Sequence, residues 1–342
     1  MNILTRSRLL STFILLGSSL LIGCDGGTSQ GGAAGTGNAG TVSTTSPPSV
    51  RKIVTTTGMV TDIVKRVAGP HATVSGLIEA GGDPHLFKPT RGDVKQLYDA
   101  DIVFYSGLKL EGKMSEMFEQ LARTGKPVFA VTEALAAASL RTPPEFEGHH
   151  DPHVWMDVNR WSQCVTHVAE SLAKIDPLHA DEYRTNAVGY VDELIRLDEY
   201  VKKSIASIPE SQRVLVTAHD AFGYFSLAYD IKVKSVQGVS TESEAGVLDV
   251  NRLVDFLVER KLPAIFVESS VNAKNIQAVI EGAASRSVTI RVGGELFSDA
   301  MGNEGTYEGT YIGMIDHNAT LITRALGGDA PEKGLHGKLG GK

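Results

Sequence analysis

Residues 101–131, DIVFYSGLKLEGKMSEMFEQLARTGKPVFAV, contain the local pattern that decides the fold. The run at 101–105 is short and apolar, as expected for a buried strand. Residues 112–123 then follow a helical spacing, and 127–131 return to a strand pattern. A strand, a helix and a second strand in succession predict a parallel sheet with helices on its faces.

The same alternation extends in both directions from this segment. The predicted strands are 53–57, 72–78, 101–105, 127–131, 213–217, 232–236, 264–267 and 288–292. The predicted helices are 58–68, 91–98, 112–123, 220–229, 251–260, 272–284 and 307–326. Residues 79–90 are rich in Gly and Pro, which favours a loop.

Between these two alternating stretches, 158–208 contains no convincing strand, and its apolar residues recur at helical spacing. Pro177 either kinks this run or separates two helices. The predicted fold class is therefore α/β with two lobes, each a parallel-type sheet flanked by helices, joined by a long connecting helix. We expect the N-terminal lobe at 51–156, the helical connector at 157–208 and the C-terminal lobe at 209–326.

The N-terminus has the features of an export signal. Arg6 and Arg8 precede an apolar run at 9–23, which is too short for a comfortable membrane span. The run ends at Cys24 and looks like a bacterial lipobox, which predicts a signal peptide at 1–23 and lipidation of Cys24. The alternative is an ordinary secretory signal followed by a chance cysteine.

The composition sets further limits on structure and partners. Residues 24–50 are almost wholly small and polar, so we expect a flexible tether, and 327–342 are expected to form a loose tail. A formal charge of −7 on an exported chain argues against nucleic acid as a partner. Cys164 is the only cysteine besides Cys24, which favours a core position, and we expect a monomer.

Four residues with side chains that commonly bind metals lie just after strand-like runs: His85, His153, His219 and Asp299. Because strand ends of an α/β fold converge on one crevice, these side chains could meet in the cleft between the lobes. Three imidazoles and one carboxylate form a suitable set for a divalent transition metal ion. The triplet Asp-Pro-His occurs at both His85 and His153, which suggests that one local geometry is made twice.

Each candidate also has a simpler interpretation. A loop histidine is usually exposed, His149 and His150 compete with His153, and Asp299 could be a helix cap or a loop acid. Asp83 could hydrogen-bond the imidazole of His85 from behind. The remaining rivals or supporting carboxylates are Glu242, Glu244, Glu268 and Glu295.

Five separated motifs resemble one known family. They are DPHLFKPT at 83–90, DPHVWMDV at 151–158, TAHDAFGYF at 217–225, QGVSTESEAG at 237–246 and LFSDAMG at 296–302. They resemble the metal-binding lipoprotein family of bacterial ABC importers, the cluster A-I solute-binding proteins for manganese, zinc or iron.

The resemblance implies a two-lobed protein with a long helix and one transported divalent ion per chain, held by His85, His153, His219 and Asp299. It also implies an ABC permease as partner and an exported, lipid-anchored chain facing the periplasm or the cell exterior. Three imidazoles favour Zn²⁺, whereas a carboxylate that binds through both oxygens makes Mn²⁺ reasonable, so the metal stays open. Because binding requires neutral imidazoles, affinity is expected to fall below about pH 6.5.

Two other functions are compatible with parts of the sequence. A secreted zinc hydrolase would use the three histidines plus a water and a carboxylate base such as Glu244 or Glu268. The chain has no HExxH or GxSxG motif, so we expect no enzyme activity. A siderophore-type binding lipoprotein would need an aromatic and Arg-rich cleft, but aromatic residues are only 6% of the chain.

Overall fold

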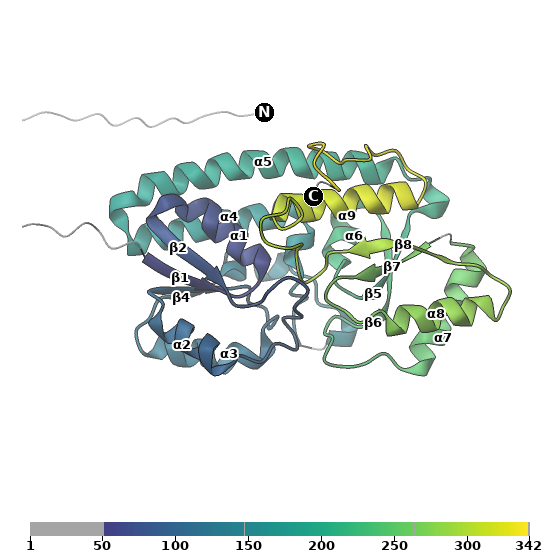
Figure 1. Cartoon of the computed structure of the whole chain (residues 1–342), viewed down its shortest axis with the longest axis horizontal. Coiled ribbons are helices and arrows are strands. Elements are labelled where there is room, and N and C mark those ends of the chain that lie inside the picture. Colours follow the sequence, from purple (N-terminus) through teal and green to yellow (C-terminus); the bar gives the residue numbers. More distant parts are fainter. Residues whose placement is uncertain (1–50, 147, 263, 341–342) are drawn as a thin grey trace, which may run out of the picture. The chain divides into compact units, whose positions relative to one another are not determined.

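The structure, a computed structural model, describes residues 51–146, 148–262 and 264–340 (Figure 1). Residues 49–342 form one compact unit. The predictions of a signal peptide at 1–23, lipidation of Cys24 and a tether at 24–50 lie outside the described residues. Within the described part of the chain, no helix is both long enough and apolar enough to cross a membrane.

The first half of the fold is built on one parallel sheet in the order β2-β1-β3-β4. Its two central strands are the most buried, and the side chains of Ile53 and Phe104 lie in the core. The strands are β1 (Arg51–Thr55), β2 (Ala72–Gly76), β3 (Ile102–Tyr105) and β4 (Val128–Ala130). The helices between them are α1 (Gly58–Ala68), α2 (Arg91–Asp99) and α3 (Ser115–Arg123).

Two helices follow without any intervening strand, α4 (Val158–Ile175) and α5 (Ala180–Ala206). Pro177 lies in the short turn between them, so it separates two helices. The 27 residues of α5 correspond to a length of about 40 Å. This long helix packs against α1 of the first half and against α9 of the second half (Figure 1).

The second half contains two parallel strand pairs, β5-β6 and β7-β8, with β5 and β7 in contact with each other. The strands are β5 (Val214–His219), β6 (Lys232–Gln237), β7 (Ala264–Glu268) and β8 (Arg291–Leu296). The helices are α6 (Gly223–Tyr229), α7 (Val247–Arg260), α8 (Lys274–Ala284) and α9 (Tyr311–Ala325). The predicted α/β fold with parallel sheets flanked by helices is confirmed.

Several helices begin at side chains that satisfy the free backbone N–H groups of the first turn. The hydroxyl of Thr57 accepts a hydrogen bond from the backbone N–H of Val60 at the start of α1. The hydroxyl of Thr310 accepts one from the backbone N–H of Gly313 at the start of α9. Asp157 accepts two backbone N–H groups at the start of α4. These caps fix where the loops that carry functional residues end.

The last strand differs from the sequence prediction. We expected a strand at 288–292, but β8 runs over Arg291–Leu296 and passes through Gly293 and Gly294. A Cβ at Gly293 would lie 2.6 Å from the ring of Phe266, and Gly294 has a φ of +143° beside a register shift in the β7-β8 pair. The two glycines lie just beyond the predicted strand, and they allow an irregular strand to lie close to its neighbour.

Two further segments differ from prediction. Helix α6 begins at Gly223 instead of near Asp220, and Asp220 does not cap it. The segment after Leu326 was expected to be loose, but its described part packs on α9 and the core. Leu335 lies against the core, and its backbone N–H donates to the buried carboxylate of Asp316.

Candidate metal centre

His85 lies in the loop between β2 and α2, where a short Asp-Pro-His turn sets its backbone. Asp83 Oδ1 accepts a hydrogen bond from the backbone N–H of His85 at 2.8 Å, and Oδ2 accepts one from the hydroxyl of Thr241 at 2.6 Å. Asp83 therefore joins this loop to the 237–246 segment of the second half. It supports the backbone of His85. Contrary to expectation, it forms no hydrogen bond with the imidazole of that residue.

His153 lies in the second Asp-Pro-His turn, just before α4. Asp151 Oδ1 accepts from the backbone N–H of His153 at 2.9 Å, which matches the contact at His85, and it also pairs with ring Nδ1 at 2.8 Å. The other oxygen of Asp151 pairs with Arg141. The repeated triplet does make the same backbone contact twice. The two turns differ at the imidazole, which Asp151 contacts and Asp83 does not, although their sequences are the same.

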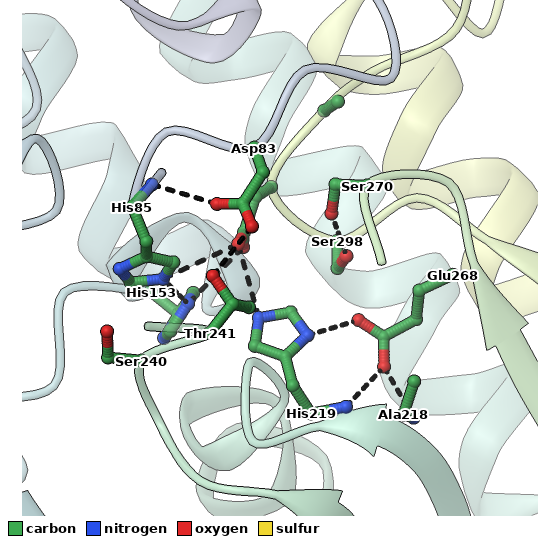
Figure 2. Close-up of polar contacts among 12 residues, drawn as sticks. Asp83, His85, His153, Ala218, His219, Ser240, Thr241, Glu268, Ser270 and Ser298 are labelled. Carbon is green, nitrogen blue, oxygen red and sulfur yellow. Dashed lines mark hydrogen bonds and ion pairs between the residues drawn. The ribbon is translucent and has the colours of Figure 1, made fainter. Parts of the chain in front are cut away.

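His219 is the last residue of β5, and Glu268 ends the neighbouring strand β7. Glu268 Oε1 accepts from the backbone N–H groups of Ala218 and His219 at 2.7 and 2.9 Å, and Oε2 pairs with ring Nδ1 of His219 (Figure 2). The carboxylate of Glu268 is thereby fully used behind the imidazole. It orients His219 so that Nε2 points towards the other candidates.

Asp299 lies three residues after β8, and its two oxygens face the three imidazoles. The side chains of His85, His153 and His219 converge in Figure 2. One potential ligand atom from each of the four residues lies within 4.8 Å of all the others. Asp299 Oδ1 lies 3.2 Å from His153 Nε2. Asp299 Oδ2 lies 3.2 Å from His219 Nε2 and 3.5 Å from His85 Nε2. The Nε2 atoms of His85 and His153 are 3.4 Å apart.

These four side chains are almost inaccessible to solvent, with exposed fractions of 0 to 3%. His219 Nε2 and both oxygens of Asp299 have no hydrogen-bond partner among the described residues. Buried polar atoms in this state are costly, and their convergence at one point suits the binding of a cation. Tetrahedral bonds of roughly 2.0–2.1 Å place neighbouring ligand atoms about 3.3–3.4 Å apart, close to the observed separations.

The electrostatics of the cluster separate the three imidazoles. Burial lowers the pKa of His85 to about 3, despite the nearby charge of Asp299. Burial opposes the charged form of His153 as well, but the carboxylates of Asp299 and Asp151 outweigh it and raise the pKa of His153 to about 9. Burial likewise opposes charge on His219, and Glu268 and Asp299 raise its pKa well above the usual value.

Asp299 stays ionised for the complementary reason. Burial acts to raise the pKa of this carboxyl group, but His219 and His153 hold it well below its ordinary range. With their pKa values raised, His153 and His219 carry positive charge beside Asp299 at neutral pH. A divalent cation that binds at the same point would replace this positive charge.

The other carboxylate and histidine candidates lie outside the cluster. Glu242, Glu244 and Glu295 are exposed, and Glu242 forms an ion pair with Lys113 at 3.5 Å. His149 contacts Lys109, and the ring of His150 contacts Thr142. The structure thus brings together the four residues that the strand ends suggested, with Glu268 behind one of them.

Comparisons with known proteins agree with the five motifs. A family model described as "Zinc-uptake complex component A periplasmic" matches residues 53–325. The manganese-binding lipoprotein MntA of Bacillus subtilis (strain 168) is 47% identical over 276 residues, which cover 80% of this chain and 89% of the relative. The zinc-binding protein TroA of Treponema pallidum (strain Nichols) is 48% identical over 274 residues, which cover 80% and 88%.

One solved structure has a similar fold along almost the whole of its own chain. The periplasmic zinc binding protein TroA from Treponema pallidum superposes with a TM-score of 0.78 at 47% sequence identity, covering 81% of this chain and 99% of that chain. The resemblance inferred from the motifs is confirmed. The chain belongs to the family described as zinc-uptake complex component A, periplasmic.

Proposed function

We propose that this chain is the extracytoplasmic solute-binding protein of an ABC importer and that it carries one divalent transition metal ion, Mn²⁺ or Zn²⁺. His85, His153, His219 and Asp299 are the proposed ligands. The observation that carries this proposal is a buried point where four donor groups converge and where three of their atoms have no hydrogen-bond partner among the described residues. The relatives MntA, a manganese-binding lipoprotein, and TroA, a zinc-binding protein, support the same class of ligand.

A binding protein fits this centre better than a zinc hydrolase. A catalytic zinc site keeps a fourth position open for water, whereas Asp299 occupies that position beside the three imidazoles. A hydrolase would also need a free carboxylate base, but Glu268 is engaged by three N–H groups and Glu244 is exposed. A siderophore site is disfavoured because ligands with 0 to 3% exposure leave no open surface for an organic chelate.

The identity of the ion is proposed only as Mn²⁺ or Zn²⁺. Three imidazole nitrogens favour Zn²⁺. Both oxygens of Asp299 lie within 3.2 Å of an imidazole nitrogen, which supports binding of the ion through both and a higher coordination number. Because an N/O site holds zinc more tightly than manganese, any manganese selectivity in the cell requires help from metal supply or from rigidity.

Membership of the family supports the proposed partner and location. The proposed partner is a membrane permease that receives the ion, and the proposed anchor is a lipid on Cys24 with the protein facing the periplasm or cell exterior. The chain is proposed to act as a monomer. The proposed lobes are 51–156 and 209–326, connected by 157–208, so that His85 and His153 come from one lobe and His219 and Asp299 from the other.

The test uses residues 49–342, which form one compact unit. Dialysis against metal followed by elemental analysis is expected to give one ion per chain, and His219→Ala is expected to lower the affinity by more than about 100-fold. His149→Ala is the matched control because His149 lies outside the cluster. The ligand assignment is wrong if His219→Ala keeps the metal content of the unaltered protein.

A further inference from the structure

The indole of Trp155 contacts segments that carry proposed ligands from both halves of the fold. We propose that Trp155 is a positioning residue for metal binding, because its Nε1–H donates to the carbonyl of Ser298 and holds Asp299 in place relative to His153. This inference rests on the proposed function, since it concerns how the same centre is kept in binding geometry.

On the Asp299 side, the backbone around the ligand is held by side chains. Asp299 lies in an irregular segment, so strand hydrogen bonds do not fix it. Instead, three neighbouring carbonyl groups each accept a hydrogen bond from a side-chain donor. Asn318 donates to the carbonyl of Phe297 at 2.6 Å, Trp155 to that of Ser298 at 3.0 Å, and Ser269 to that of Ala300 at 3.1 Å.

These three donors do not come from the same part of the chain. Asn318 and Ser269 belong to the second half, as Asp299 does, so they can fix the segment only relative to its own half. Trp155 belongs to the segment that precedes α4 and carries His153. Its hydrogen bond therefore sets the distance between ligands that come from different halves.

On the His153 side, Trp155 follows the ligand by two residues in the short 3₁₀ turn Val154–Met156. The rings of His153 and Trp155 pack edge to face with centroids 5.3 Å apart. The hydroxyl of Tyr311 donates to the carbonyl of Trp155 at 2.7 Å, which holds the backbone of this turn as well. Movement of Trp155 would therefore move the imidazole of His153.

The contact is sheltered from water, because the side chains of Trp155 and Ser298 are both 0% exposed. If the indole N–H is removed, no water reaches the Ser298 carbonyl to replace it without local rearrangement. Outer residues that orient metal ligands typically change metal affinity by about 10–100-fold when they are altered. We expect a loss of this size for Trp155→Phe, which keeps an aromatic ring but removes the donor.

Trp161 supplies a matched control. Its side chain is also 0% exposed, its ring lies 6.5 Å from that of Trp155, and its Nε1 has no hydrogen-bond partner among the described residues. Trp161→Phe therefore removes the same atoms from the same core without breaking a hydrogen bond. Any general cost of a smaller core side chain appears equally in both variants.

The experiment compares the unaltered protein, Trp155→Phe and Trp161→Phe by Zn²⁺ competition against a chelator and by the visible absorption of bound Co²⁺, which reports ligand geometry. We expect Trp155→Phe to bind Zn²⁺ about 10–100-fold more weakly and to shift the Co²⁺ bands, with Trp161→Phe within about twofold of the unaltered protein and its spectrum unchanged. Thermal unfolding without metal checks that both variants fold, and Trp155→Phe is expected to have the lower midpoint because it leaves the buried Ser298 carbonyl without its donor.

Equal affinities in the two variants, or an unchanged Co²⁺ spectrum in Trp155→Phe, would overturn the role of Trp155 and leave the proposed function intact. Failure of the unaltered protein to bind Zn²⁺ or Co²⁺ would overturn the proposed function itself. If Trp155→Phe does not fold, Tyr311→Phe carries the test, because it releases the Trp155 carbonyl and is expected to weaken Zn²⁺ binding in the same direction.

Discussion

The carboxylate of Glu268 accepts a hydrogen bond from the backbone N–H of His219 and also pairs with the Nδ1 atom of the same residue. One side chain thus fixes both the position and the tautomer of a proposed metal ligand. With Nδ1 carrying the proton, Nε2 is the nitrogen that is free to bind an ion. The ends of the neighbouring strands β5 and β7 therefore need to keep their contact for the centre to exist.

Glu268→Gln is expected to lower metal affinity by about 100-fold, at the upper end of the range for such residues. If the amide oxygen keeps the backbone N–H donors, the NH₂ group faces Nδ1 of His219. Nδ1 then becomes the acceptor and Nε2 carries the proton, which blocks the ion. Chelator competition with Zn²⁺ measures the loss. Glu295→Gln, at an exposed carboxylate, is expected to bind as the unaltered protein does, and equal affinities for both variants would refute the tautomer argument.

The pH dependence of metal affinity is expected to extend to higher pH than the sequence suggested. Carboxylates raise the pKa of His153 to about 9 and raise that of His219 as well, whereas His85 has a pKa of about 3 and is already neutral at neutral pH. Metal binding at pH 7.5 should therefore release about two protons per ion, and the metal affinity should keep rising up to about pH 9. Calorimetric titration with Zn²⁺ in buffers of different ionisation enthalpy counts these protons.

Rising pH has the opposite effect on the stability of the metal-free protein, which falls as metal affinity rises. His153 has a folded-state pKa above its ordinary value of 6.5, so it stabilises the fold fully below about pH 6.5. That contribution is lost as the pH rises through about 9. A proton count near zero on metal binding at pH 7.5 would contradict the charged state of His153 and His219.

Gly223→Ala is expected to lower the free energy of unfolding by about 1–3 kcal/mol. A Cβ at Gly223 would lie 1.3 Å from Arg141 Nη1, so the guanidinium must move away from Asp151, which it pairs with behind His153. Gly189→Ala in α5 is the control, because nothing lies within 4 Å of its Cβ and alanine favours a helix by about 0.5–1 kcal/mol. Urea unfolding of the two variants separates them, and equal stabilities would contradict the packing of Arg141.

Removal of residues 327–342 is expected to destabilise the protein by about 1–3 kcal/mol through lost hydrogen bonds to a buried carboxylate. Asp316 is fully buried and accepts from the backbone N–H of Leu335 at 2.9 and 3.0 Å. Without this segment the carboxylate keeps only the hydroxyls of Tyr307 and Thr320. Thermal unfolding measures the change, and an unaltered midpoint would mean that the segment contributes nothing to stability.

The sequence predicted those features that depend on local pattern. Alternating apolar runs and helical spacing located most elements, and the ends of the strands pointed to the four residues that the structure brings together. Their role as ligands remains a proposal, as do the boundaries of the two lobes.

Features that depend on tertiary neighbours were not predictable from local pattern. The predicted strand ended at 292, but Gly293 and Gly294 allow β8 to continue against Phe266. Asp83 and Asp151 occur in identical triplets, yet only Asp151 contacts its imidazole. The tail after Leu326 is rich in glycine, yet its described part is ordered by contacts with the buried carboxylate of Asp316 and with the core.

The most direct measurement of the central claim is X-ray absorption at the zinc edge of the loaded protein. The account predicts one ion with three imidazole nitrogens and one carboxylate group at roughly 2.0–2.1 Å. Fewer than three imidazoles around the ion, or a sulphur ligand, would contradict it.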